Sequence, residues 1–265
     1  MVSNKSFFLT SILILSANLS VPDFISERIL FSFTAKKFLQ KRGLKISPAP
    51  NGEHLKIITL IRKNAIDLVL DVGANEGQYG GYLRSIGYQG QIVSFEPLDA
   101  AFKILEQKAN ADKLWSCRHI ALGNISGESV INVSGNSQSS SILNIKGAHL
   151  DAAPEADFLT NQKIMVEKLD DIYNDITAGK PNVMLKLDVQ GFEKFVLEGA
   201  KESLKKLKGI LVEMSFEELY DGEMLYREMI DFLGQNGFVL CALKNGFHNV
   251  NTGKLLQADG FFFKI

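Results

Sequence analysis

The chain has 265 residues, of which 46% are hydrophobic and 22% are charged, and its net charge is −1. This composition is typical of a globular protein with one large domain, and a charge so close to zero excludes the basic footprint of a nucleic-acid-binding protein. The two cysteines, Cys117 and Cys241, lie far apart and form no C-x-x-C pattern, which argues against a disulfide framework and against a zinc site.

We expect two parts in the chain, an N-terminal helical extension over residues 1–50 and one globular domain over residues 51–265. The boundary is indicated by Gly43 and by the Pro, Asn and Gly residues at positions 47–52, because such residues punctuate regular structure.

Two stretches of the extension are apolar enough to contact the sheet of the domain or a membrane. Residues 24–42 combine apolar residues with a basic end, so they are expected to cover the sheet of the domain; the alternative is a peripheral membrane contact through residues 1–45. Residues 7–17 are apolar but too few to span a bilayer, and they resemble a weak signal peptide.

The stretch that organises the domain is residues 68–79, LVLDVGANEGQY. It predicts a buried strand with an acid, Asp71, near its end, followed by a turn and the start of a helix. Gly73 and Gly77 let the backbone of the turn approach a flat ligand at the carboxyl end of the strand, where open α/β sheets bind their ligands. The stretch therefore predicts a nucleotide-type pocket.

The spacing of the turn indicates which nucleotide is bound. The second glycine of G-x-G-x-x-G, which lets a pyrophosphate rest on bare backbone, is missing. Asp71, Glu76 and the amide of Gln78 would crowd or repel a pyrophosphate, but they suit a ligand that carries an ammonium and a sulfonium. We therefore predict S-adenosylmethionine as the cofactor.

A second acid supports this prediction. Residues 91–97 form a short apolar strand that ends at Glu96, about 25 residues after Asp71, near the offset at which nucleotide folds place the acid that binds ribose hydroxyls. Pro97 then ends the strand. Either acid alone can simply begin a turn or cap a helix, and it is the two in this order that favour a site.

From residue 53 onward strands and helices alternate, which predicts a mostly parallel sheet with helices on both faces. Within this order we expect a single strand over residues 117–122 and a helix over residues 216–236. Residues 123–168 interrupt the alternation with two strands and a polar loop. We expect this insertion to build an acceptor pocket, with Ser139, Ser140 and Ser141 as polar residues that could reach a substrate.

The strand at residues 182–188 carries two charged residues. Period-two alternation places Lys186 and Asp188 on one face, and a lysine inside an apolar strand is costly unless it is paired. The next strand again ends in an acid, Glu213. Asp188 and Glu213 are expected on neighbouring strands, where they could share a divalent cation, but two carboxylates alone make a weak site, so no metal is predicted.

With these motifs in hand, the chain resembles the FkbM family of S-adenosylmethionine-dependent methyltransferases over about residues 53–265. The resemblance rests on five ordered motifs: residues 71–78, 94–97, 121–123, 185–200 and 212–213. It implies a Rossmann-like class I methyltransferase fold with a mostly parallel seven-stranded sheet, and an O-methyltransferase that acts on a hydroxyl of a sugar, a glycolipid or a related metabolite. One departure is Gln190, where the family often has Glu.

The resemblance and the motifs together give an expected set of site residues. The cofactor-binding residues are expected to be Asp71, Gly73, Asn75, Gly77, Gln78, Glu96, Pro97, Ala121 and Leu122. Transfer of a methyl group to a hydroxyl needs alignment of the two reactants and removal of the acceptor's proton. We expect Asp188 to be the base, with Lys186 and Glu213 beside it and Glu193 as a further support; Glu193 has the alternative of stabilising the start of its helix. His149, in the insertion, is an alternative base.

Two other functions fit part of the pattern. A nicotinamide-dependent oxidoreductase fits the alternating architecture but not the glycine spacing. A non-catalytic domain that binds S-adenosylmethionine or a glycan fits the motifs without the chemistry. Because the expected cofactor is cytosolic, we expect the protein in the cytoplasm, with membrane association as the alternative, and this disfavours export.

Overall fold

The computed structural model describes residues 52–264. The expected N-terminal extension over residues 1–50, its apolar stretch at 7–17 and the alternative membrane contact through residues 1–45 lie outside the described residues. Within the described part of the chain, no helix combines the length and the apolar character that a membrane crossing requires.

The main feature is a seven-stranded sheet with the order β3-β2-β1-β7-β8-β10-β9. Its strands are β1 (Leu68–Val72), β2 (Gln91–Phe95), β3 (Trp115–Arg118), β7 (Val183–Leu187), β8 (Gly209–Ser215), β9 (Phe238–Asn245) and β10 (Gln257–Lys264). The first five of these pair in parallel, and β10 is antiparallel to both β8 and β9. The expected mostly parallel sheet of seven strands, with the class I methyltransferase fold, is therefore confirmed.

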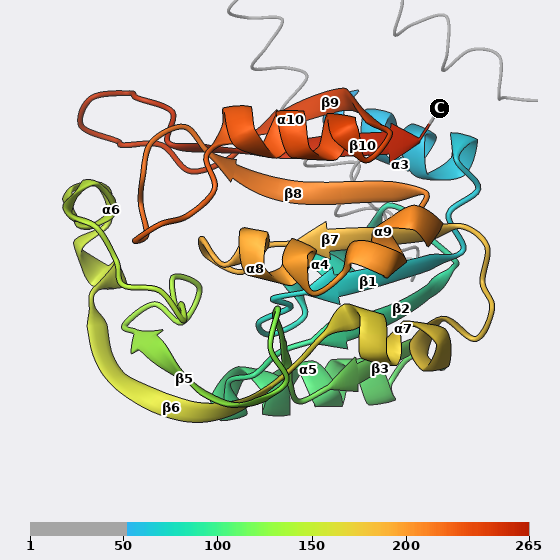
Figure 1. Ribbon diagram of the computed structural model, residues 1–265, viewed down its shortest axis with the longest axis horizontal. Helices are drawn as coiled ribbons and strands as arrows, with labels where there is room; N and C mark the ends of the chain where they lie inside the picture. The colour runs from blue at the N-terminus through green and yellow to red at the C-terminus, as the bar shows by residue number, and fades with distance from the viewer. Residues whose placement is uncertain (1–51, 265) are drawn as a thin grey trace, which may run out of the picture. The chain divides into compact units, whose positions relative to one another are not determined.

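Helices cover both faces of this sheet (Figure 1). One face packs against α3 (Gly52–Lys63), α4 (Gln78–Ser85) and α5 (Asp99–Asn110). The other face packs against α7 (Leu169–Thr177), α8 (Glu193–Glu198), α9 (Lys201–Lys206) and α10 (Tyr226–Gln235). Successive side chains of a strand point to opposite faces, so on β1 Leu70 belongs to the second core while Val69 and Asp71 point toward the first. Both faces of the central strands β1 and β7 are thus buried.

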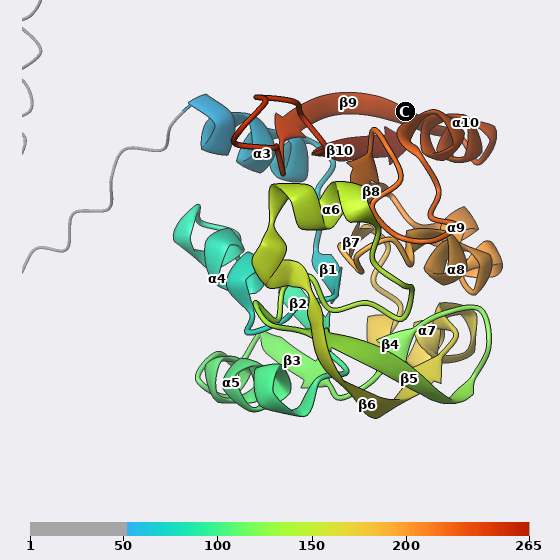
Figure 2. The same ribbon diagram turned by 90° about the vertical axis from the view of Figure 1, so that its left-hand side faces the viewer.

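The insertion, together with the two residues of β4 just before it, forms a second sheet with the order β4-β6-β5. It consists of β4 (Ala121–Leu122), β5 (Gly127–Ser134) and β6 (Phe158–Glu167), with α6 (Gly147–Ala152) and a short 3₁₀ helix (Pro154–Ala156) between β5 and β6. Figure 2 shows β5, β6 and α6 in front of the carboxyl ends of the parallel strands. The insertion therefore lies at the ligand-binding edge of the main sheet.

Two expected elements differ from the structure. The single strand over residues 117–122 is two strands in two sheets, because β3 loses its partner where β2 ends; the N–H of Glu96 makes the last contact, to the carbonyl of Arg118 at 3.2 Å. The helix over residues 216–236 begins only at Tyr226. Before it the chain turns through Gly222 with φ +72°, a left-handed backbone that ends a helix.

Candidate active site

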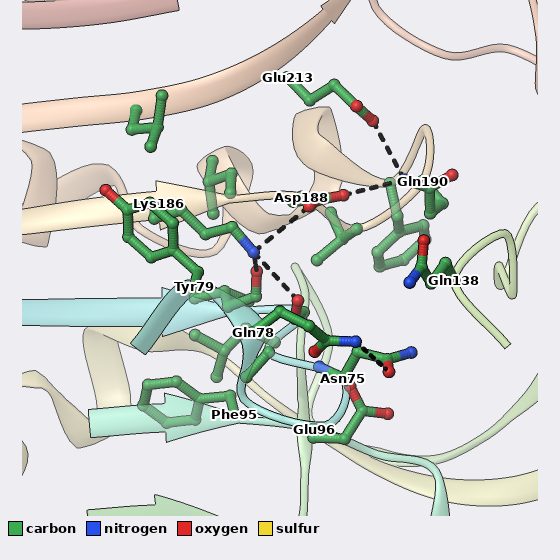
Figure 3. Close-up of a pocket in the computed structure, with 18 of the residues that line it drawn as sticks. Asn75, Gln78, Tyr79, Phe95, Glu96, Gln138, Lys186, Asp188, Gln190 and Glu213 are labelled. Carbon is green, nitrogen blue, oxygen red and sulfur yellow. Dashed lines mark hydrogen bonds and ion pairs between the residues drawn. The ribbon is translucent and has the colours of Figure 1, made fainter. Parts of the chain in front are cut away.

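The cavity at the carboxyl ends of β1, β2, β7 and β8 has a volume of about 440 Å³, within the range of roughly 300–1,000 Å³ that small-molecule pockets occupy. Ten of the expected site residues line it: Gly73, Asn75, Gln78, Glu96, Pro97, Ala121, Leu122, Lys186, Asp188 and Glu213. Figure 3 shows Asn75, Gln78 and Glu96 at one side of it and Lys186, Asp188 and Glu213 at the other. The structure therefore brings expected site residues from five different segments of the chain to one cavity.

The turn after β1 is pressed against the neighbouring strands. The N–H groups of Gly73 and Ala74 donate to the carbonyl of Phe95 at 3.1 and 3.0 Å. Gly73 has φ +72°, and a Cβ at this position would lie 1.8 Å from the backbone oxygen of Asp188. Only glycine fits here, because both the left-handed backbone and the close approach exclude a side chain.

Gly77 lies against α5 and β3, outside the lining of the cavity. It precedes α4 with φ +80°, and a Cβ there would meet Leu105 and the ring of Trp115 at 3.0–3.1 Å. It is not part of the cavity wall. Gly77 therefore allows α4 to pack closely, while Asn75 and Gln78, whose side chains are joined by a 3.1 Å hydrogen bond, face the cavity.

Glu96 is held by the backbone at the end of β2. Its Oε2 accepts the N–H of Asn75 at 2.8 Å and its Oε1 accepts the N–H of Leu98 at 2.9 Å. The residue is 4% exposed, and burial raises the pKa of Glu96 to about 7, although the two N–H groups lower it. Each oxygen keeps a lone pair for a further donor, so the carboxylate can accept the hydroxyls of a ligand.

Asp71 lies beneath the cavity instead of lining it. It is fully buried, its Oδ2 accepts the hydroxyl of Ser94 at 3.1 Å, and its Oδ1 lies 3.2 Å from Lys186 Nζ. Lys186 Nζ also donates to the carbonyl of Gly73 at 3.0 Å and lies 3.4 Å from Asp188 Oδ2. Burial opposes the charge of Lys186, but Asp188 and Asp71 outweigh it and raise the pKa of the lysine above its usual value. The expected pairing of Lys186 is therefore confirmed.

Asp188 and Glu213 are linked by an amide. Gln190 Nε2 donates to Asp188 Oδ1 at 2.8 Å and to Glu213 Oε2 at 3.0 Å (Figure 3). Burial, followed by the charge of Asp188, raises the pKa of Glu213 well above its usual value. The side chain of Asp188 is 41% exposed, so a ligand in the cavity can reach its carboxylate.

The remaining candidates have mainly structural positions. Glu193 is buried, accepts the N–H of Val189 at 3.0 Å, and has a pKa that burial raises to about 8; it does not line the cavity. His149 is also buried outside the cavity, against the ring of Tyr220, and burial lowers its pKa to about 4. Neither is placed to meet a ligand directly.

The serine run of the insertion is built into the cavity's edge. Ser140 lines the cavity, and its Oγ accepts the N–H of Ser134 at 3.0 Å. Ser141 Oγ donates to the backbone carbonyl of Gln190 at 2.6 Å, while Ser139 is buried. Among residues 52–264, no group of three or more His, Cys, Asp and Glu side chains is arranged to hold a metal ion.

Sequence reasoning missed several cavity residues, among them Asp259. It lies on β10 opposite Glu213, and it pairs with Lys244 at 3.0 Å. The signal was available, since Asp259 is a lone acid between apolar residues of a strand, as Lys186 is a lone base. Gln138, from the insertion, gives no such signal because a glutamine in a polar loop is ordinary.

The comparisons with known proteins are consistent with one another. A family model described as the methyltransferase FkbM domain matches residues 71–240. The 2-O-methyltransferase NoeI of Sinorhizobium fredii (strain NBRC 101917 / NGR234) is 25% identical over 223 residues, which cover 81% of this chain and 90% of that protein.

Two solved structures are similar at low identity. The methyltransferase FkbM from Methylobacillus flagellatus KT is 12% identical with a TM-score of 0.43; the match covers 74% of this chain and spans 43% of that one. The magnesium protoporphyrin IX methyltransferase ChlM from Synechocystis PCC 6803, solved with bound SAM, is 10% identical with a TM-score of 0.43, over 94% of this chain and 100% of that one.

Proposed function

Because this chain belongs to the FkbM methyltransferase family and is an S-adenosylmethionine-dependent methyltransferase, we propose that it methylates a hydroxyl group of a sugar, a glycolipid or a related metabolite. The observation that carries the proposal is the exposed carboxylate of Asp188 on the wall of the cavity, because a hydroxyl acceptor needs a base. Similarity to a 2-O-methyltransferase supports an oxygen acceptor. We place the activity in the cytoplasm, where the donor is available.

We propose that the donor binds at the Glu96 side of the cavity. We assign the ribose hydroxyls to the carboxylate of Glu96, which lines the cavity, and the adenine ring to the apolar wall of Pro97, Ala121 and Leu122. Gly73 and Asn75, in the turn after β1, also line the cavity, and we assign them to contact with the donor. When bound, S-adenosylmethionine supplies an activated methyl group on its sulfonium.

Asp188 then has a defined role. It accepts the proton of the acceptor hydroxyl while the oxygen forms a bond to the methyl carbon and the carbon–sulfur bond breaks. Lys186, beside Asp188, orients the carboxylate, and Glu213 lies on the neighbouring strand at the acceptor side. The protein's contribution is mainly alignment, because the methyl group is already activated.

The affinity for S-adenosylhomocysteine, the expected product, should depend on pH through Glu96. The ionised carboxylate accepts ribose hydroxyls, and the pKa of Glu96 is about 7 in the free protein. The affinity should therefore be constant above that pH and fall about tenfold per pH unit below it. Isothermal titration calorimetry between pH 5.5 and 8 measures this. The Glu96→Gln protein should bind weakly with no such dependence; an equally strong pH dependence in that variant would move the effect to another group.

The proposed reaction is tested by transfer of a radiolabelled methyl group from S-adenosylmethionine. The acceptors are neutral methyl glycosides, glycolipids with the same sugars, and matched deoxy sugars that lack single hydroxyls. Labelling of one glycoside and loss of labelling with one deoxy analogue is the expected result. Labelling of amines or thiols, with none of the hydroxyl compounds modified, would overturn the hydroxyl assignment.

A further inference from the structure

Gln190 holds an unusual backbone conformation at the edge of the cavity. Its φ is +54°, and that of Gly191, the next residue, is +88°. A Cβ on Gly191 would lie 2.7 Å from the side chain of Tyr220, so the turn after β7 is packed tightly against this buried ring. A left-handed backbone is disfavoured for a residue such as glutamine, and it persists where the surrounding contacts determine it.

The side chain of Gln190 uses both ends of its amide. Nε2 donates to Asp188 Oδ1 at 2.8 Å and to Glu213 Oε2 at 3.0 Å, and Oε1 lies 2.8 Å from the hydroxyl of Tyr220. The opposite orientation of the amide would point its oxygen at two carboxylates, so the network determines the orientation. Figure 3 shows the amide nitrogen between the two acids.

The backbone of Gln190 joins the same network to the insertion. Its carbonyl accepts the hydroxyl of Ser141 at 2.6 Å, and the hydroxyl of Tyr220 also lies 3.1 Å from the carbonyl of Ser139. The segment at residues 139–141 thus contacts Gln190 both directly and through Tyr220. A continuous chain of hydrogen bonds therefore connects this segment, through the amide, to Asp188.

Gln190 Nε2 donates to two carboxylates in surroundings that are themselves acidic. The charged groups that act on Glu213 are Asp188, Asp259, Glu193 and Lys186. Burial raises the pKa of Tyr220, and the charge of Glu223, a further acid nearby, raises it as well. Two lysines offset part of this negative charge: Lys186 pairs with both Asp71 and Asp188, and Lys244 pairs with Asp259. An uncharged donor between two carboxylates favours their ionised forms without adding a charge of its own. A carboxylate in its place would add a third like charge.

We infer that Gln190 is a positioning residue for methyl transfer, whose amide orients Asp188 toward the acceptor hydroxyl and keeps it apart from Glu213. The inference rests on the proposed role of Asp188 as the base. It also assigns a purpose to the contact between Gln190 and Ser141, which fixes the base relative to the insertion that borders the acceptor side.

Two substitutions of Gln190 test the inference. Gln190→Asn keeps an amide and a residue type that tolerates the left-handed backbone, but it is too short to reach both carboxylates. Gln190→Glu keeps the length and replaces the donor by an acid. The matched control is Gln235→Glu, the same change at an exposed position of α10.

The readouts are a ¹³C NMR titration of the Asp188 and Glu213 carboxyl groups, assigned with Asp188→Asn and Glu213→Gln, and the pH dependence of methyl transfer to the glycoside panel. Both Gln190 variants should raise the titration midpoint of the two carboxyl groups by about one pH unit, because hydrogen bonds to charged groups are lost. The acidic limb of the pH–rate profile should move by the same amount. The shift should be larger in Gln190→Glu, which also adds a like charge. Binding of S-adenosylhomocysteine should stay close to that of the unaltered protein.

The outcomes separate the inference from the proposed function. A carboxyl titration unchanged in both variants would overturn the role of Gln190, whatever the panel shows. An active Asp188→Asn protein would instead overturn the role of Asp188 and leave Gln190 without a base to position. If no glycoside is methylated, the titration still decides whether Gln190 controls the two carboxyl groups.

Discussion

Replacing Lys186 with methionine is expected to lower the free energy of unfolding by about 3–5 kcal/mol, the usual effect of removing one partner from a buried ion pair. Asp71 is fully buried and lies 3.2 Å from Lys186 Nζ. Without the ammonium its charge remains in a low-dielectric core, where it is costly. Urea denaturation measures the difference directly.

Two further variants test whether the loss of stability comes from the buried ion pair. Lys186→Met combined with Asp71→Asn should recover a large part of the loss, because no uncompensated charge then remains. Lys205→Met removes the lysine of the exposed pair with Glu202, whose side chains are both 68% exposed, and should cost less than about 1 kcal/mol. Equal losses for Lys186→Met and Lys205→Met would show that the buried pair contributes no more than a surface pair.

The Asp188→Asn protein is expected to lose about 10²–10⁴-fold in methyl-transfer rate, the contribution of a positioned general base. The amide is nearly the same size as the carboxylate but cannot accept the acceptor's proton. The affinity for S-adenosylhomocysteine should change little, since we assign the donor mainly to Glu96 and the turn after β1. The rate and the affinity are measured by the radiolabel assay and by calorimetry.

The control for this second change is Asp231→Asn, the same substitution at an exposed position of α10, which should keep the normal rate. A normal rate in Asp188→Asn as well would remove Asp188 as the base. Glu213 would then be the next residue to test, because it lines the same cavity on the neighbouring strand. His149 would not, because it is buried outside the cavity.

Much of the fold followed from the periodicity of the sequence. Alternation along residues 182–188 placed Lys186 and Asp188 on one face, and the structure joins them at 3.4 Å. The missing second glycine of the dinucleotide motif favoured S-adenosylmethionine over a nicotinamide cofactor, and the family match supports that prediction. Local pattern was sufficient in both cases because strand geometry and turn geometry are themselves local.

The position of Asp71 could not be read in the same way. Its residue type matched an acid near the end of a strand, but one more residue of β1, Val72, follows it. By strand alternation Asp71 lies on the same face as Val69, which α3, α4 and α5 cover. Strand ends are set by pairing with β2 and β7, which a single sequence does not reveal.

The helix expected over residues 216–236 was too long for a related reason. Its first ten residues contain apolar side chains that suit a helix, but Glu223 accepts the N–H groups of Leu219 and Tyr220 and so closes a loop. That loop places Tyr220 against Gln190. Tertiary contacts determine it, and they outweigh the local preference of the segment.

The contact between Gly73 and the backbone of Asp188 has a consequence for how such an enzyme can change its substrate. The two backbones touch so closely that no side chain fits between them, so the distance from the turn after β1 to the backbone of Asp188 is set by main-chain packing. The insertion at residues 123–168 forms a separate sheet. Substitutions in the insertion that keep the contacts of residues 139–141 with Gln190 and Tyr220 are therefore expected to change which acceptor fits the cavity without changing the position of Asp188. Acceptor selectivity can then diverge while the reacting geometry is kept.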